Sequence, residues 1–393
     1  MIQLRPHQER ATIAMRQNSI GQILVPTGGG KTLIAIMDAV KRFEVNVPRT
    51  VVVVAPRILL AEQLCSDYLE HVTNANVLHV HSGETKHFRT TKSDHIKLFV
   101  EMCQTVREHV IIFTTYHSLH RVQESGIPVD TIYFDEAHNS VQRNFFGPTE
   151  YFSGHADRCF FFTATRKTSV TINKPGMNDR EVYGDIIARV SAPELVKGGY
   201  IAPPKVYVKE FGIHQNAKKI TCDVDCEHVI STMDDIDMKK ILVCVRTSRQ
   251  LMNLMAHTDF AQQCQDRGYS FLYITSKTGA VVDGKKVNRE QFFETLNTWG
   301  KDPEKKFVVL HRSILSEGIS INRLDSVIFL RNMDVIELTQ SVGRVLRTSP
   351  EKAFGLCVVP VYSKVGISTQ RALQNVIDTV FEKGEILDSV TRR

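Results

Sequence analysis

The chain has 393 residues, of which 42% are hydrophobic and 23% are charged, and these proportions are typical of globular proteins. This length allows two or three domains, and the composition excludes collagen, low-complexity polymers and small disulfide scaffolds. Lys and Arg number 49 and Asp and Glu 43, so the net charge is only +6. Because the basic excess is spread evenly along the chain, charge alone does not indicate a nucleic-acid partner.

Signals for membranes and secretion are missing from the sequence. The N-terminal stretch MIQLRPHQER is charged and lacks the apolar run of a signal peptide. No stretch reaches about 18 uninterrupted apolar residues, which a membrane-spanning helix needs. We therefore expect an intracellular protein, cytoplasmic or nuclear, that does not bind membranes.

The eight cysteines are scattered along the chain. Several lie in apolar runs, such as Cys244 and Cys357, which indicates small buried side chains in a reducing compartment. Cys222, Cys226 and His228 are close in sequence, but a zinc site usually needs four ligands with tighter pairing. The sequence therefore favours an ordinary loop at this point and no metal.

Short β-branched apolar runs alternate with longer amphipathic stretches along the whole chain. Such continuous apolar strands between helices predict parallel sheets covered on both faces. We therefore predict an α/β fold with two tandem units, residues 1–190 and 191–393, joined where PG, GG and PP dipeptides cluster near 170–205. The predicted strands of the first unit are 20–25, 50–56, 109–115, 131–136 and 158–165; those of the second are 205–211, 241–245, 270–275, 306–311, 326–331 and 354–360, with helical spacing at 247–266 and 366–384.

A glycine-rich stretch joins the first predicted strand to an apolar-periodic helix, which is the context of a P-loop. The glycines let backbone N–H groups surround phosphate oxygens, and the helix N-terminus adds partial positive charge. Lys31 would reach the β- and γ-phosphates of ATP, and Thr32 would ligate Mg²⁺. The strict pattern has glycine where this chain has Val25. The predicted phosphate-binding residues are Thr27, Gly28, Gly29, Gly30, Lys31 and Thr32.

An acidic pair follows the apolar run 131–134 about 100 residues after the P-loop. Carboxylates at the carboxyl end of a parallel strand face the ligand crevice. Asp135 is expected to hold Mg²⁺ through water, and Glu136 to orient and deprotonate the attacking water. The sequence therefore predicts an ATP-hydrolysing site with these two residues and Lys31 as catalytic groups.

Together with this D-E-A-H stretch, further motifs resemble superfamily 2 helicases and translocases over nearly the whole chain. The resemblance is closest to the type III restriction and phage DNA-remodelling branch, and it implies two tandem RecA-like P-loop domains. The matching segments are LRPHQ (4–8), APRILLAEQ (55–63), TTYHSL (114–119), TAT (163–165), ILVCVRTSRQ (241–250), ILSEGISI (314–321) and QSVGRVLR (340–347).

The resemblance assigns roles to individual residues. Gln8 would read adenine with Arg5 as a stacking partner, and Gly318 and Gln340 would also contact the nucleotide. Hydrolysis would be coupled to movement by Thr163 and Thr165, with His138 bridging the nucleotide site to the last motif. The expected nucleic-acid contacts go mainly to phosphates, which carry little sequence information, so we expect weak sequence preference; they come from Arg57, Thr115, Arg246 and Ser316.

Two arginines in the last motif have an independent physical rationale. Arg344 and Arg347 lie three residues apart on a predicted helix, so they would share one face. Phosphoryl transfer spreads negative charge over the γ-phosphate, which arginine fingers stabilise. We therefore expect both residues to act on ATP from the second unit. The motif before them departs from the family, because Ser320 replaces an Asp that commonly holds the ribose, which leaves nucleotide selectivity open.

The sequence predicts an ATP-dependent nucleic-acid motor, a helicase or translocase that acts as a monomer. Two alternatives share every motif, namely an RNA helicase and a DNA translocase subunit without strand separation. TAT and the LRPHQ start favour DNA over RNA. The only candidates for an unwinding wedge are 82–95 and 276–288, which are equally typical of surface loops. Such a compact motor is also typical of phage- or virus-encoded proteins.

Overall fold

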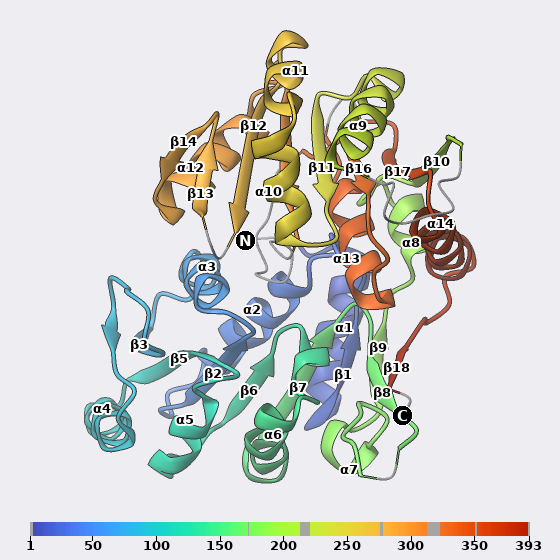
Figure 1. Cartoon of the computed structure of the whole chain (residues 1–393). Coiled ribbons are helices and arrows are strands. Elements are labelled where there is room, and N and C mark those ends of the chain that lie inside the picture. The colour runs from blue at the N-terminus through green and yellow to red at the C-terminus, as the bar shows by residue number, and fades with distance from the viewer. Residues whose placement is uncertain are drawn as a thin grey trace. The chain divides into compact units, whose positions relative to one another are not determined.

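The structure, a computed structural model, describes residues 3–171, 173–212, 221–275, 278–312, 323–349 and 352–391. The chain forms two compact units: unit 1 comprises Met1–Ser191 and Leu387–Arg393, and unit 2 comprises Ala192–Ile386. Each unit contains a sheet with helices packed on it (Figure 1), which confirms the predicted α/β class with two tandem units.

The sheet of unit 1 has eight strands, and all of its pairings among the described residues are parallel. Its central strands β2, β5 and β6 are buried at every position, which explains their uninterrupted apolar sequences. In spatial order the strands are β4 (Phe88–Arg89), β3 (Ala75–Val80), β5 (His109–Thr115), β2 (Thr50–Ala55), β6 (Thr131–Phe134), β7 (Arg158–Thr163), β1 (Ile20–Leu24) and β9 (Ile186–Arg189).

Helices connect these strands, as parallel pairing requires. A separate two-stranded parallel sheet pairs β8 (Lys167–Ser169) with β18 (Ser389–Thr391). The helices of unit 1 are α1 (Pro6–Gln17), α2 (Lys31–Arg42), α3 (Ile58–Leu69), α4 (Ser93–Thr105), α5 (Leu119–Ser125), the 3₁₀-helix η1 (Ala137–Asn139), α6 (Arg143–His155) and α7 (Arg180–Tyr183).

Strand order in this sheet brings three sequence motifs together. Strand β7 pairs with β6 on one side and with β1 on the other, so Leu24 lies opposite Thr163 and Phe134 opposite Phe161. The carboxyl ends of parallel strands meet at one edge of the sheet. The segments after β1, β6 and β7 therefore emerge side by side, although 140 residues of chain separate the first from the last.

The sheet of unit 2 also has eight strands, six of them parallel. The last two, β13 and β14, pair antiparallel and extend the edge beside β12. In spatial order the strands are β10 (Pro204–Glu210), β17 (Gly355–Val361), β16 (Ser326–Phe329), β11 (Lys240–Cys244), β15 (Phe307–His311), β12 (Ser270–Thr275), β13 (Gly279–Val282) and β14 (Lys285–Val287).

The helices of unit 2 bury apolar side chains against this sheet, including Val229, Leu251 and Leu254. They are α8 (Ala192–Lys197), α9 (Cys222–Ile236), α10 (Ser248–His257), α11 (Phe260–Asp266), α12 (Arg289–Lys301), α13 (Val335–Val345), α14 (Lys364–Val376) and the π-helical turn η4 (Ile377–Glu382). None of the helices in the described ranges is long and apolar enough to cross a membrane.

Some segments differ from the expectation. The stretch with Cys222 and Cys226 is the start of helix α9, where a loop was expected, because the Thr221 side chain caps the helix by accepting from the Val224 N–H. The C-terminal segment, expected in the second unit, groups with unit 1, where Asp388 pairs with Arg166 at 2.5 Å. Figure 1 shows this last strand, β18, beside β8.

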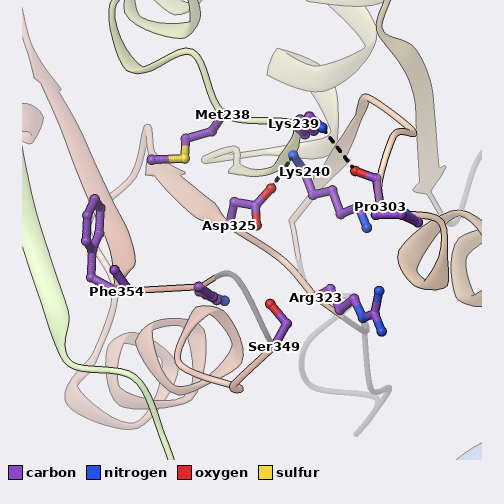
Figure 2. Close-up of a pocket in the computed structure, with 10 residues that line it drawn as sticks. Met238, Lys239, Lys240, Pro303, Arg323, Asp325, Ser349 and Phe354 are labelled. Carbon is purple, nitrogen blue, oxygen red and sulfur yellow. Dashed lines mark hydrogen bonds between the residues drawn. The ribbon is translucent and has the colours of Figure 1, made fainter.

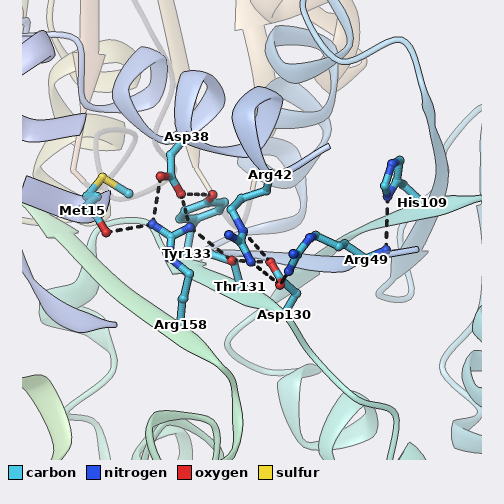
Figure 3. Close-up of polar contacts among 9 residues, drawn as sticks. All are labelled: Met15, Asp38, Arg42, Arg49, His109, Asp130, Thr131, Tyr133 and Arg158. Atoms are coloured by element: carbon cyan, nitrogen blue, oxygen red, sulfur yellow. Dashed lines mark hydrogen bonds and ion pairs between the residues drawn. The ribbon is translucent and has the colours of Figure 1, made fainter. Parts of the chain in front are cut away.

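Two buried carboxylates bind arginines beneath the sheet of unit 1 (Figure 3). Asp38 on α2 accepts two hydrogen bonds from Arg158, at 2.8 and 2.9 Å, and a third from the Tyr133 hydroxyl at 2.6 Å. Asp130 accepts two from Arg42, at 2.9 and 2.6 Å, and also pairs with Arg49. These pairs tie α2 to the amino ends of β6 and β7, so they fix the helix that begins at the glycine-rich loop.

Asp38→Ala is expected to destabilise unit 1 by about 3–5 kcal/mol, because it leaves the buried Arg158 guanidinium and Tyr133 hydroxyl without their acceptor. Urea unfolding followed by circular dichroism measures this loss. The matched control is Asp185→Ala, because the Asp185–Arg180 pair at 3.1 Å is 67% and 82% exposed and should leave the midpoint almost unchanged. Equal effects of the two substitutions would contradict a structural role for the Asp38 pair.

Candidate functional site

The glycine-rich loop between β1 and α2 has the conformation that a phosphate cradle needs. Gly28 and Gly30 have φ values of 88° and 82°, which glycine adopts without steric cost. A Cβ atom on Gly30 would lie 2.3 Å from the Gln8 Nε2 atom, so a larger residue would displace the Gln8 amide besides being strained by the positive φ. Helix α2 begins at Lys31 with no side-chain cap among the described residues. Its first N–H groups and the positive end of its dipole therefore suit an anion.

Two residues of α1 hold this loop from below. The His7 Nε2 atom lies 2.8 Å from the Gly29 carbonyl oxygen and donates to it, and the Gln8 Nε2 atom donates to the Gly30 carbonyl at 3.3 Å. The Gln8 Oε1 atom accepts from the Arg5 N–H at 3.0 Å. His7 and Gln8 are each at most 2% exposed. In the structure the Gln8 amide contacts the loop, and its predicted role in reading adenine stays a prediction. The contribution of His7 was missed, because no sequence signal separates it from the other histidines.

The acidic pair lies directly after β6 in a constrained turn. The Asp135 N–H donates to the Val54 carbonyl at 2.9 Å, and the Tyr116 hydroxyl donates to the Asp135 carbonyl at 2.8 Å. Glu136 has a φ of 45°, in the left-handed region that residues other than glycine rarely occupy. Such strain persists only where the surroundings enforce it, and it concentrates at functional sites.

A chain of polar contacts joins the segments that follow the three strands. The Lys31 ammonium lies 3.3 Å from Glu136 Oε1, and Glu136 Oε2 lies 3.5 Å from His138 Nδ1. The same His138 nitrogen lies 3.1 Å from the Thr163 hydroxyl, which itself donates to the Thr165 carbonyl at 2.9 Å. Because the Thr163 hydrogen is used there, His138 Nδ1 must carry the proton that joins the two residues. The structure thus brings together five residues that the sequence proposed for hydrolysis and coupling.

The charge balance of this site favours a bound cation. Burial, and then the charge of Glu136, raise the pKa of Asp135 to about 7, against the lowering effect of Lys31. Two carboxylates therefore share one lysine. The Thr27 hydroxyl in the loop is also buried and has no hydrogen-bond partner within the described part of the chain. A bound cation would neutralise the charge of the two carboxylates, and a bound ligand could form a hydrogen bond with the Thr27 hydroxyl.

In unit 2, a second buried polar cluster lies at the carboxyl ends of β11, β15 and β16. The Cys244 thiol lies 3.2 Å from His311 Nε2, and Arg331 donates to Glu337 at 2.8 Å. Burial, with the charges of Arg331 and Arg344, lowers the pKa of His311 to about 3, so this imidazole is neutral. His311 and Arg331 were not identified from the sequence, which offers only an ordinary strand ending at each.

The sequence predicted that the two arginines of the last motif share one helical face, and this prediction is wrong. Arg344 is in the last turn of α13 and 6% exposed, and Gln340 lies one turn earlier in the same helix. The helix ends at Val345, and Arg347 forms an isolated antiparallel bridge with Ile201. Helix α13 ends two residues too early for the predicted arrangement, and burial lowers the pKa of the Arg347 guanidinium.

The residues expected to contact nucleic acid are dispersed. Arg57 precedes α3 and is exposed, as is Arg246 after β11. Thr115 ends β5 and is only 3% exposed, so it offers little surface to a ligand. The expected contacts from Ser316 and Gly318 lie outside the described residues, as does the motif around them.

The best-defined pocket of unit 2 lies away from these motifs, at the amino ends of its strands (Figure 2). It has a volume of about 380 Å³ and is lined by four basic residues, by Asp325 and by apolar and neutral side chains; the basic residues are Lys239, Lys240, Arg323 and Lys352. The Lys240 ammonium donates to the Gly300 carbonyl at 2.8 Å, and its backbone N–H to Asp325 at 3.0 Å. The pocket and its lysines therefore lie at the amino ends of the strands, opposite the carboxyl ends where the motif residues lie.

Comparison with known proteins matches the first part of the chain to one family. Residues 1–168 match the model of the type III restriction enzyme res subunit. No curated protein sequence matches the chain significantly.

Solved structures share the fold of the whole chain. An ATP-dependent type ISP restriction-modification enzyme, LlaBIII bound to DNA, aligns with 99% of this chain at a TM-score of 0.75 and 17% identity. A nuclease-deletion mutant of the type ISP enzyme LlaGI, in complex with a DNA substrate mimic, aligns with 95% at 0.68 and 20% identity. S. cerevisiae Dbp5 bound to RNA and ADP BeF3 aligns with 98% of the chain and 89% of its own length, at 0.60 and 14% identity.

The present chain spans only 31% of LlaBIII and 28% of LlaGI. The family match in unit 1, the shared fold and the clustered motifs agree with one another. The first 168 residues match the type III restriction res-subunit family, and the whole chain shares the fold of these restriction enzymes and of Dbp5, with two tandem α/β units.

Proposed function

We propose that this chain is an ATP-dependent nucleic-acid motor that moves along DNA. The observation that carries the proposal is the contact chain from Lys31 through Glu136 and His138 to Thr163. It links a phosphate-binding loop, a carboxylate suited to act as a base, and the segment after β7 in one unit. A site that only bound a nucleotide would not need this connection.

The geometry indicates how hydrolysis would proceed. Without nucleotide, the Lys31 ammonium pairs with Glu136 at 3.3 Å. A γ-phosphate that attracts Lys31 would release the Glu136 carboxylate to accept the proton of the attacking water. The loss of that negative charge would then reach Thr163 through His138, whose protonated Nδ1 faces both residues. Through these contacts, the hydrogen bonds of Thr163 and of the segment after β7 would change when the nucleotide binds or is hydrolysed.

The residues present also fit Mg²⁺ as the metal cofactor. Asp135 is fully buried beside Glu136, and its raised pKa indicates that a second positive charge besides Lys31 is needed to stabilise both carboxylates. Asp135 and the Thr32 hydroxyl, at the start of α2, would hold the ion with the phosphates. Bound there, Mg²⁺ would neutralise charge on the β- and γ-phosphate oxygens.

Movement on DNA without strand separation is the form of the activity that we favour. The type ISP enzymes that share the fold are DNA-bound, according to their descriptions, whereas Dbp5 is RNA-bound. Both segments considered as wedges instead extend sheet edges in their described residues, as β4 in unit 1 and as β13 and β14 in unit 2. An RNA helicase is the second candidate, supported by the similarity to Dbp5 over the length of both chains.

The same proposal places the motor inside the cell, acting as a monomer. All eight cysteines are free thiols, and seven of them are buried. Free thiols persist in a reducing compartment. Contacts to nucleic-acid phosphates would give weak sequence preference.

The experiment that tests the function is the ATPase rate measured side by side with single-stranded DNA, duplex DNA and RNA. We expect strong stimulation by duplex DNA, with Glu136→Gln binding ATP but hydrolysing it at least about 10²-fold more slowly, since it lacks the base. Lys31→Ala should abolish activity. Stimulation by RNA alone would support the second candidate, and undiminished turnover by Glu136→Gln would remove Glu136 from the role of base.

Arg347→Ala is expected to lower the ATPase kcat by about 10³-fold if Arg347 acts as an arginine finger. Arg347→Lys keeps a charge but not the planar fork, so it should recover only part of the rate. Arg344→Ala should in addition destabilise unit 2, because Arg344 is buried. A loss of only a few-fold in the Arg347 variant would leave it a structural residue.

Asp135→Asn is expected to stabilise the nucleotide- and metal-free protein at pH 8, on the order of 2 kcal/mol. The pKa of Asp135 is about 7 in the folded chain and about 4 when unfolded. The folded state therefore binds the proton more tightly, and the destabilising effect of ionisation grows from about pH 4 to pH 7. Urea unfolding should show a smaller gain at pH 5 than at pH 8; an equal gain at both values would exclude this electrostatic origin.

A further inference from the structure

A cluster of metal-ligand side chains lies in unit 1, away from the nucleotide site. Helix α3 contributes Glu62 and Cys65, strand β3 contributes His79, and the segment after β3 contributes His81 and His87. Two groups of three have their donor atoms within 4.8 Å of one another: Cys65 with His79 and His87, and Glu62 with His79 and His81. Only Glu62 lies in one of the motif segments, APRILLAEQ (55–63); the three residues of the first group lie outside them.

Hydrogen bonding in this cluster leaves two buried atoms unsatisfied. The Gly83 N–H donates to His81 Nδ1 at 3.2 Å, so the proton of a neutral His81 is on Nε2. That N–H lies 2.9 Å from His79 Nδ1 and donates to it, so the proton of His79 is on Nε2. His79 is fully buried, and its Nε2 has no partner in the described part of the chain; the same is true of Glu62 Oε1.

This arrangement distinguishes the two groups. A metal on His81 Nε2 would require a proton on His81 Nδ1, which would then face the Gly83 N–H. At His79 the corresponding conflict would be with the His81 Nε2–H, 2.9 Å from Nδ1, and it can be relieved because Glu62 Oε1 lies 3.1 Å from His81 Nε2 and can accept that hydrogen. If a cation replaced the proton on His79 Nε2, the proton would move to Nδ1, which lies 3.2 Å from the unsatisfied Glu62 Oε1. A carboxylate behind a ligating histidine is the usual support of a metal site.

We propose that Cys65, His79 and His87 form a Zn²⁺ site, with Glu62 supporting His79. One thiolate and two imidazoles are borderline-soft donors of the kind zinc prefers, and three protein ligands leave a fourth position for water. On binding, the Cys65 thiol releases its proton to solvent, and the His79 proton moves from Nε2 to Nδ1. No electron transfer is involved.

The distances are close to those of an assembled site. Two imidazoles on one tetrahedral zinc have ring centres roughly 5 Å apart, and the His79 and His87 rings are 5.6 Å apart, at 11° to each other. Cys65 is 2% exposed and His79 is buried, whereas His87 is exposed and provides a route for the ion.

The metal would add a further link between helix α3 and the segment after β3, which already meet through Glu62 and His81 at 3.1 Å. His87 precedes β4, a strand of two residues, and Cys65 is on α3, which begins next to Arg57. Zinc would thus hold the segment after β3 against the helix that carries an expected nucleic-acid contact. The site would stabilise unit 1 and fix the position of this segment.

Cobalt substitution in the full-length protein tests the site directly. The chelator-treated protein is titrated with Co²⁺, and a thiolate-to-cobalt charge-transfer band is expected at one equivalent, reversed by Zn²⁺. Cys65→Ser should abolish the band and His87→Ala should weaken binding at least about 10-fold, whereas Glu62→Gln should weaken it about 10–100-fold with the band retained. The matched controls, Cys103→Ser and His95→Ala on α4, should change nothing.

Thermal unfolding provides an independent measurement. A hundredfold excess of Zn²⁺ over its dissociation constant should raise the melting temperature by about 5 °C or more in the wild type, and not in His87→Ala, which changes an exposed side chain. The absence of a charge-transfer band in folded wild-type protein, or its persistence in Cys65→Ser, would overturn the proposal. Stoichiometric cobalt binding without that band would assign the ion to other ligands and would equally overturn it.

Discussion

The pairing of β7 with both β6 and β1 is the constraint on which the rest of the structure depends. It sets the carboxyl ends of three parallel strands next to one another, so the glycine-rich loop, the acidic turn and the segment after β7 begin a few ångströms apart. None of these segments could form the contact chain by itself. The buried pairs of Asp38 with Arg158 and of Asp130 with Arg42 secure the opposite edge of the same strands, and so hold the sheet and α2 in register.

The site in unit 1 contains features that lower the stability of the folded chain when no ligand is bound. Glu136 is held at a positive φ, and two carboxylates lie beside a single lysine in a place where burial raises the pKa of Asp135 to about 7. Each of these features destabilises the chain without ligands, and under the proposed function each would become favourable when phosphate and a divalent ion bind. His138 makes the arrangement responsive, because one protonated nitrogen faces both the catalytic carboxylate and Thr163. A change in the charge of Glu136 would therefore alter the contact of His138 with Thr163, at the end of β7.

Unit 2 has an α/β sheet like that of unit 1, but the charged residues at the carboxyl ends of its strands differ. Its carboxyl edge carries a buried cationic cluster, in which burial, and then the charges of Arg331 and Arg344, lower the pKa of His311 and keep it neutral. Of the arginines expected to act on ATP, Arg344 is buried in the last turn of α13, and Arg347 follows the end of the helix and bridges Ile201. Fixed positive charge of this kind costs no reorganisation when charge develops on a phosphate.

The sequence by itself determined the fold class and the identity of the residues around the P-loop and the acidic turn. Uninterrupted β-branched runs allow only buried strands, and a run of three glycines before Lys31 has few structural uses besides a phosphate loop. These are local properties, so they can be read from local sequence. Tertiary structure decided the rest: that Gln8 and His7 support the loop, that α13 stops before Arg347, that Cys222 starts a helix, and that the C-terminal strand returns to unit 1. The cluster around His79 was also invisible in the sequence, because its ligands come from α3, β3 and the following segment, and only the packing of helix on sheet brings them within bonding distance.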